Sequence, residues 1–216
     1  MKNIENKVAI IILLATLLTI TALSAVAEES TDSTVLIAYF TYAENIDTTG
    51  MTPDAISSAS AGPTTNVMGN IQVMAQVLEK RTGGQIYPIH VQTPYAPAYT
   101  DMHDGALDEQ RQGNMIPLVG AVENMDGFGL VYLGTPIWGG ALPQPVVTFL
   151  STYDFSGKTI VLFGVNLGSG FDGLAGQIQQ LCPDAVVAEH FSLNARTGND
   201  EAEQAFSAWL DELSFN

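Results

Sequence analysis

The stretch that decides the fold is Gly129-Leu130-Val131-Tyr132-Leu133-Gly134-Thr135-Pro136-Ile137-Trp138-Gly139. It begins as a short apolar run, typical of a buried strand, and passes directly into a loop of Pro, Trp and Gly. In open α/β sheets, ligands bind to loops at the carboxyl ends of the strands. A second loop, Asn166-Leu167-Gly168-Ser169-Gly170, follows the next strand-like run, residues 159–164. The two loops together predict a slot for a flat, partly apolar ring.

Outward from this stretch, strand-like and helix-like segments alternate along the chain. The expected strands are residues 34–40, 85–91, 129–133, 159–164 and 185–191. The expected helices are residues 68–81, 100–112, 173–181 and 199–213, together with one that opens at Pro143 or Pro145 and ends near residue 152. A helix that connects two successive strands returns the chain to the same end of the sheet, so the strands are parallel, and these crossovers are right-handed. This order therefore predicts an α/β fold with a five-stranded parallel sheet and helices on both faces.

The first 27 residues have the composition of an export signal. Lys2 and Lys7 precede an apolar run over residues 8–20, and Ala25-Val26-Ala27 is a small-residue cleavage site. The apolar stretch is also nearly long enough for an uncleaved membrane anchor, and that alternative stays open. In either case residues 28–216 are expected to form one domain outside the cytoplasm, secreted or at the cell surface.

The charge of the chain excludes several classes of partner. The sequence has seven basic and 23 acidic residues, and without residues 1–27 five basic and 22 acidic residues remain, a formal charge of −17. Nucleic acids and anionic lipid surfaces are bound by clusters of Lys and Arg, so neither is expected as a partner. No membrane contact is expected beyond an N-terminal anchor. Cys182 is the only cysteine and is expected to be buried near a helix end.

A long polar segment, residues 41–66, separates the first expected strand from its helix. Loops at this position usually have about 2 to 6 residues, so the segment is expected to be functional or mobile. It lies at the first turn from strand to helix, which is where this class of sheet holds phosphate.

With this order of elements, the chain resembles the flavodoxin family. Residues 134–139 are similar to the Tyr-Pro-Ile-Trp-Trp-Gly loop of short flavodoxin-like proteins, and residues 145–150 and 153–159 continue the similarity, which runs from about residue 35 to 213. The resemblance implies a flavodoxin-like three-layer sandwich with strand order 2-1-3-4-5. It also implies that FMN binds noncovalently at the carboxyl edge of the sheet.

The resemblance also implies which residues contact the isoalloxazine ring of FMN. The residues expected on one side are Thr135, Pro136, Ile137, Trp138 and Gly139, and those on the other side are Asn166, Gly168, Ser169 and Gly170. Trp138 offers a face for offset stacking. An indole at this position is also compatible with a core or interface aromatic residue.

The phosphate motif departs from the family pattern. Flavodoxins similar to this chain have hydroxyl residues followed by Gly-Asn-Thr after the first strand, whereas residues 41–45 and 69–71 each match that pattern only in part. The expected phosphate contacts are Thr41, Thr65, Gly69 and Asn70. Because a carboxylate repels phosphate, Glu44 is expected to point away from it.

Other motifs in the chain favour no other chemistry. Residues 168–173 match the dinucleotide pattern G-x-G-x-x-G, but they follow the fourth expected strand rather than the first. His90, His103 and His190 lack metal-ligand spacing, and no G-x-S-x-G motif occurs. No side chain is predicted to act as acid, base or nucleophile.

The sequence therefore predicts an FMN-binding, flavodoxin-like electron-transfer protein that acts outside the cytoplasm. Its expected partners are redox proteins or small quinone-like acceptors. Two alternatives stay open: an NAD(P)H-dependent quinone-type reductase, and a flavin-free surface or binding module with the same fold.

Overall fold

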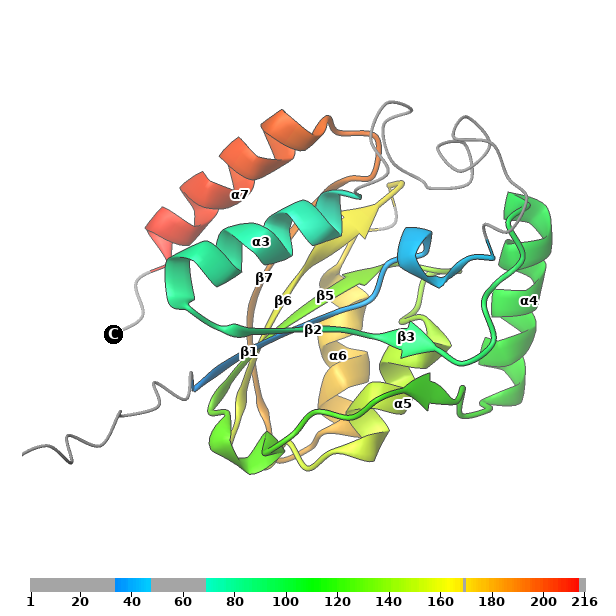
Figure 1. The fold of residues 1–216 in the computed structure, drawn as a ribbon, viewed down its shortest axis with the longest axis horizontal. Helices are drawn as coiled ribbons and strands as arrows, with labels where there is room; N and C mark the ends of the chain where they lie inside the picture. Colours follow the sequence, from blue (N-terminus) through cyan, green and yellow to red (C-terminus); the bar gives the residue numbers. More distant parts are fainter. Residues whose placement is uncertain (1–33, 48–68, 169, 214–216) are drawn as a thin grey trace, which may run out of the picture. The chain divides into compact units, whose positions relative to one another are not determined.

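The computed structural model describes residues 34–47, 69–168 and 170–213, which form an α/β sandwich. Its main sheet consists of β1 (Val35–Tyr39), β2 (Gln85–Pro88), β5 (Leu130–Pro136), β6 (Thr159–Asn166) and β7 (Val186–Asn194). All neighbouring strands are parallel, and their order is β2-β1-β5-β6-β7 (Figure 1). This order confirms the predicted 2-1-3-4-5 topology. The expected export signal lies outside the described residues.

Helices cover both faces of the sheet. They are α3 (Asn70–Thr82), α4 (Tyr99–Gln112), α5 (Gln144–Thr152), α6 (Asp172–Leu181) and α7 (Asn199–Glu212), with short 3-10 turns η1 (Ala43–Asn45) and η2 (Met125–Gly127). Helices α3 and α7 lie side by side on one face, and α5 and α6 cover the other (Figure 1). Among the described residues, no helix combines the length and hydrophobicity needed to cross a bilayer.

Alternation along β1 shows how the two faces are filled. Leu36 and Ala38 belong to the apolar cluster beneath α4, α5 and α6, whereas Ile37 and Tyr39 belong to the cluster beneath α3 and α7. Successive side chains of a strand point to opposite faces, so a central strand covered on both sides must be apolar throughout. Burying one Leu or Ile side chain contributes about 2 kcal/mol, which makes this double burial the main source of stability.

One predicted strand, residues 85–91, is divided in the structure. Only β2 pairs with β1, and β3 (His90–Val91) instead pairs antiparallel with β4 (Leu118–Val119). The Asn45 side chain takes the place of a neighbouring strand: Nδ2 donates to the carbonyl of Ile89 (3.1 Å), and Oδ1 accepts from the N–H of Val91 (2.8 Å). The expectation of one continuous strand was wrong because an amide from a distant turn satisfies these backbone groups.

Cys182 directly follows the last residue of α6 and is buried, as the sequence predicts. Burial, followed by the negative charge of Asp154, raises the pKa of the thiol to about 11. The reactive form of a thiol is the thiolate, and a pKa of about 11 lowers the thiolate fraction at pH 8 roughly 100-fold relative to an ordinary cysteine.

We therefore expect iodoacetamide to label native Cys182 about 100-fold more slowly than the same cysteine in urea-unfolded protein. Labelling followed by intact-mass measurement at pH 8 checks this expectation. Equal rates in the native and unfolded protein would show that the thiol is exposed.

Candidate ligand site

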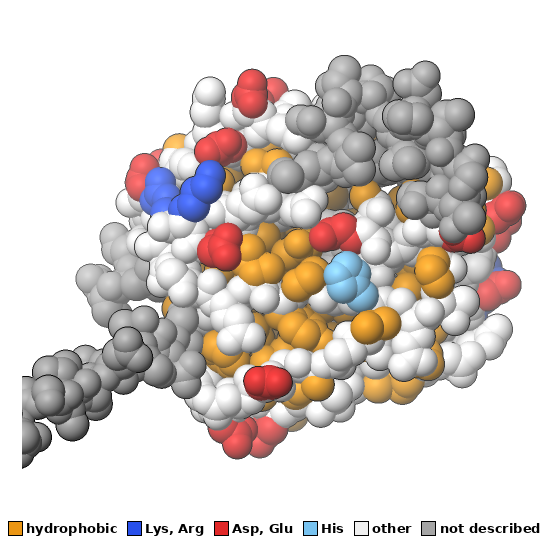
Figure 2. Space-filling model, in the orientation of Figure 1, with side chains coloured by type: hydrophobic (Ala, Val, Ile, Leu, Met, Phe, Trp, Pro, Cys, Tyr) orange, Lys and Arg blue, Asp and Glu red, His pale blue; other side chains and the backbone are white. Residues whose placement is uncertain are grey.

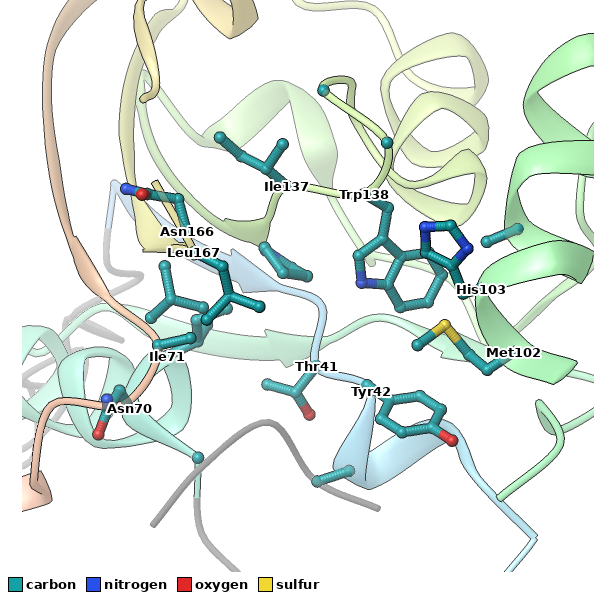
Figure 3. A pocket seen from close by; sticks show the side chains of 18 of the residues that line it. Thr41, Tyr42, Asn70, Ile71, Met102, His103, Ile137, Trp138, Asn166 and Leu167 are labelled. Carbon is teal, nitrogen blue, oxygen red and sulfur yellow. The ribbon is translucent and has the colours of Figure 1, made fainter. Parts of the chain in front are cut away.

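A cavity of about 370 Å³ opens at the carboxyl edge of the sheet, within the range of small-molecule sites. It is lined by residues 41–43, 69–71, 136–140 and 165–167, by Ala195 and by one side of α4 (Figure 3). These segments are the continuations of β1, β5, β6 and β7, together with the start of α3. The cavity therefore lies at the sheet edge where the sequence predicts a ring slot.

The turn after β5 forms one wall of the cavity. The N–H of Trp138 donates to the carbonyl of Ala141 (3.0 Å) and the N–H of Ala141 donates back to the carbonyl of Trp138 (3.0 Å), which closes a two-residue turn. Gly139 and Gly140 have φ angles of 56° and 82°. Turns of this kind need positive φ at both central residues, so the Gly-Gly pair follows from the geometry. A Cβ on Gly139 would also lie 2.5 Å from Leu107.

Helix α4 anchors this turn. The Gln110 side-chain Nε2 donates to the carbonyls of Trp138 (2.8 Å) and Leu142 (3.3 Å). Tyr95, at the base of the same wall, donates its hydroxyl to Glu109 of α4 (2.9 Å). Burial, followed by the charge of Glu109, raises the pKa of Tyr95, so the phenol stays protonated. The turn is thus held on a rigid support before any ligand binds.

The indole of Trp138 belongs to both the core and the cavity. Its ring makes edge-to-face contacts with Phe40 (5.3 Å between centroids, 80°), Tyr95 (5.2 Å, 89°) and Tyr42 (6.3 Å, 76°). It is only half-buried and lines the cavity beside His103 and Met102 of α4 (Figure 3). Such contacts fix the orientation of the ring and are worth about 1 kcal/mol each beyond burial.

The loop after β6 forms the facing wall. Asn166 Oδ1 accepts from the N–H of Gly168 (2.7 Å), and the carbonyl of Asn166 accepts from the N–H of Ala195 (2.9 Å). Leu167, which lies between Asn166 and Gly168 in this loop, lines the cavity, and 54% of its surface is exposed. A large exposed leucine at the mouth of a cavity offers an apolar cover for a flat ligand.

The first turn of α3 forms the end of the cavity opposite α4. Gly69 and Asn70 line it. The first N–H groups of a helix have no intrahelical acceptor, and here Gly69 provides no side-chain cap for them. Helix starts of this kind attract anions. Thr41 also lines this end, but its hydroxyl donates to Glu44 Oε2 (2.6 Å). Glu44 is not among the lining residues, yet its carboxylate lies directly behind Thr41.

The structure places eight of the thirteen predicted site residues in the lining of the cavity. These are Thr41, Gly69, Asn70, Pro136, Ile137, Trp138, Gly139 and Asn166. Thr135, which the resemblance places beside the ring, is fully buried and outside the lining, and its hydroxyl donates to the carbonyl of Pro136 (2.9 Å). Gly168 and Gly170 lie in the loop after β6 but not in the lining, because Leu167 provides that wall. Thr65 and Ser169 lie outside the described residues.

The contribution of α4 is missing from the sequence prediction. Met102, His103, Ala106 and Leu107 line the cavity. The sequence of this helix is mostly polar. The signal that could have indicated an apolar face is the pair Met102 and Ala106, which are four residues apart and both buried in the structure. No Lys or Arg lines the cavity within the described ranges, and these ranges contain no cluster of His, Cys, Asp or Glu suited to a metal ion.

A doubly covered parallel sheet of order 2-1-3-4-5, with a cavity between two loops at its carboxyl edge, defines a flavodoxin-like α/β protein. The family model described as flavodoxin matches residues 63–213, so the chain belongs to the flavodoxin family.

Solved structures show the same fold. A protein of Bacteroides eggerthii assigned as a flavoprotein is 25% identical over 84% of this chain and 98% of its own, with a TM-score of 0.61. A Bacteroides uniformis protein assigned in the same way is 22% identical over 80% and 97%, with a TM-score of 0.57. A Lactobacillus acidophilus flavoprotein in complex with FMN is 13% identical over 80% and 97%, with a TM-score of 0.50. No curated protein matches the chain.

Proposed function

We propose that this chain binds FMN in the cavity at the carboxyl edge and carries electrons between partners outside the cytoplasm. The observation that carries the proposal is the cavity itself, bounded by the Trp138 turn, the loop after β6 and the start of α3. Membership of the flavodoxin family and the FMN complex of the Lactobacillus protein of like fold support the choice of ligand.

The residues of the cavity fit the ring of FMN. Ile137 and Trp138 on one side and Leu167 on the other would hold the ring between apolar surfaces, and Asn166 would present its amide at the ring edge. Bound FMN supplies reversible one- and two-electron redox chemistry.

The charge of the protein would act on that chemistry. Reduction adds negative charge to the ring, and the formal charge of the chain is −16. On the face shown in Figure 2, acidic side chains are scattered, whereas basic ones gather mainly near the C-terminal end of α3. Negative charge around a site makes further negative charge less favourable, so the acidic shell would lower the potential of the last reduction step.

Electron carriage fits the proposed location better than substrate turnover. Nicotinamide donors are scarce outside the cytoplasm, which favours carriage. Partner proteins with redox centres, or small quinone-like acceptors, would meet the ring at the exposed Leu167 and Gly140 rim.

Titration with FMN, followed by tryptophan fluorescence, tests the cofactor. The Trp209→Phe variant reports the fluorescence of Trp138 alone, and the Trp138→Phe variant reports that of Trp209 alone. Trp138 lines the cavity, whereas Trp209 packs against Phe206 on α7, on the opposite face of the sheet. Strong quenching of Trp138 that saturates at one FMN per chain is expected, with a much smaller change for Trp209. Equal responses would place the flavin elsewhere, and no response would favour a flavin-free module.

A comparison of two rates tests carriage against catalysis. Reduction of the FMN-loaded protein in single-electron steps, followed by absorbance, is expected to be fast with a one-electron donor. Steady-state oxidation of NAD(P)H in the presence of a quinone is expected to be slow. Rapid steady-state turnover would instead assign the protein as a quinone-type reductase.

A further inference from the structure

A carboxylate lies beside the end of the cavity where the tail of a flavin would rest. Glu44 Oε2 accepts from the hydroxyl of Thr41 (2.6 Å), and Oε1 accepts from the hydroxyl of Tyr39 (3.1 Å) and from Gln72 Nε2 (3.4 Å). Thr41 lines the cavity, and Gln72 belongs to the first turn of α3. The charge of Glu44 is therefore held between the end of β1 and the start of α3.

Among the described lining residues, both side-chain hydroxyl groups already donate hydrogen bonds within the protein. That of Thr41 donates to Glu44, and that of Tyr42 donates to the carbonyl of Ala96 (2.6 Å). A phosphate group at neutral pH mainly accepts hydrogen bonds, so neither hydroxyl can serve it without breaking an existing bond. Within the described ranges, no Lys or Arg lines the cavity to offset the negative charge.

The amide of Asn70, in the first turn of α3, bonds to a carbonyl that does not line the cavity. Its side chain is 4% exposed, and Nδ2 donates to the carbonyl of Thr197 (2.8 Å), which fixes the amide orientation because the reverse would place two oxygens together. Its Oδ1 has no partner among the described residues. Because Nδ2 is already bonded and Oδ1 has almost no accessible surface, the Asn70 amide offers no hydrogen-bond donor to a phosphate in the cavity.

We propose that this end of the cavity gives the terminal phosphate of a flavin no advantage, with Glu44 as the residue that disfavours phosphate. The inference rests on the proposed flavin-binding function. FMN remains a ligand, held through its ring. The first turn of α3 attracts the phosphate, and the Glu44 carboxylate beside it opposes that attraction.

The dissociation constants of riboflavin and FMN, measured by flavin fluorescence with the full chain, test this proposal. Wild-type protein is expected to bind the two within about threefold of each other, or riboflavin more tightly. Higher salt is expected to tighten FMN binding and leave riboflavin binding unchanged, because salt screens the repulsion. Glu44→Gln is expected to tighten FMN binding roughly tenfold and to change riboflavin binding less than twofold.

The control is Glu203→Gln on the exposed side of α7, which removes the same charge and is expected to change neither affinity. Glu44→Ala, which frees the Thr41 hydroxyl, is expected to tighten FMN binding as Glu44→Gln does. A wild-type preference for FMN above threefold would overturn the role of Glu44 and leave the proposed function in place. Wild-type protein that binds neither flavin would overturn both. The wild-type ratio decides the proposal even if the Glu44 variants fail to fold.

Discussion

Gly164→Ala is expected to lower the free energy of unfolding by about 3 kcal/mol, a large fraction of the stability of a single domain. Gly164 pairs with Thr135 where β5 and β6 run together. A Cβ at this position would lie 1.8 Å from the carbonyl oxygen of Thr135 and 2.7 Å from Phe171. The carbonyl belongs to the backbone of the neighbouring strand, so relief requires the two strands to separate. Both loops of the site begin within two residues of this pair.

Gly176→Ala is the matched control for this prediction. Gly176 lies in α6, is exposed, and has no atom within 4 Å of an added Cβ. Alanine is expected to raise stability there by about 0.5 to 1 kcal/mol through helix propensity. Urea unfolding followed by circular dichroism measures both variants. Two variants of equal stability would contradict the close approach of the strands at Gly164.

Trp138→Ala is expected to weaken FMN binding by roughly 30- to 100-fold, about 2 to 3 kcal/mol. The change removes the aromatic surface expected to face the ring, and it also removes the contacts that hold Phe40 and Tyr95 in place. We expect the stability to fall as well, because the indole is part of the core. The measurement is the dissociation constant of FMN at a temperature where the variant is folded.

Trp138→Phe separates the two effects. Phenylalanine keeps an aromatic face and most of the packing, and FMN binding is expected to weaken less than tenfold. Trp138→Ala protein that is folded and binds FMN within threefold of wild type would show that the indole is a core residue without a role in the site.

The elements of the main sheet could be predicted because each is a local apolar run between strong turn signals. The predicted strands 129–133 and 159–164 correspond to β5 and β6, which continue to Pro136 and Asn166 in the expected loops. The division of residues 85–91 could not be predicted, because it depends on the amide of Asn45, 46 positions away from Val91. Such distant side-chain bonds leave no periodic signal in the sequence.

The site was predicted where its residues are contiguous in sequence and missed where they are brought together by packing. The Gly-Gly turn beside Trp138 has a recognisable local signature. The wall formed by Met102 and Leu107 depends on how α4 docks against that turn, with Gln110 as the anchor. The sequence indicates that Glu44 is unusual at its position, but only the structure shows its carboxylate bound to the Thr41 hydroxyl.

Native mass spectrometry of the purified chain mixed with FMN tests the central claim most directly. If the two loops and the start of α3 form a flavin site, one FMN per chain is expected to remain bound in wild-type protein. The adduct is expected to diminish strongly in Trp138→Ala and to persist in Gly176→Ala. Wild-type protein that shows no FMN adduct at any ligand concentration would contradict the assignment of this cavity as a flavin site.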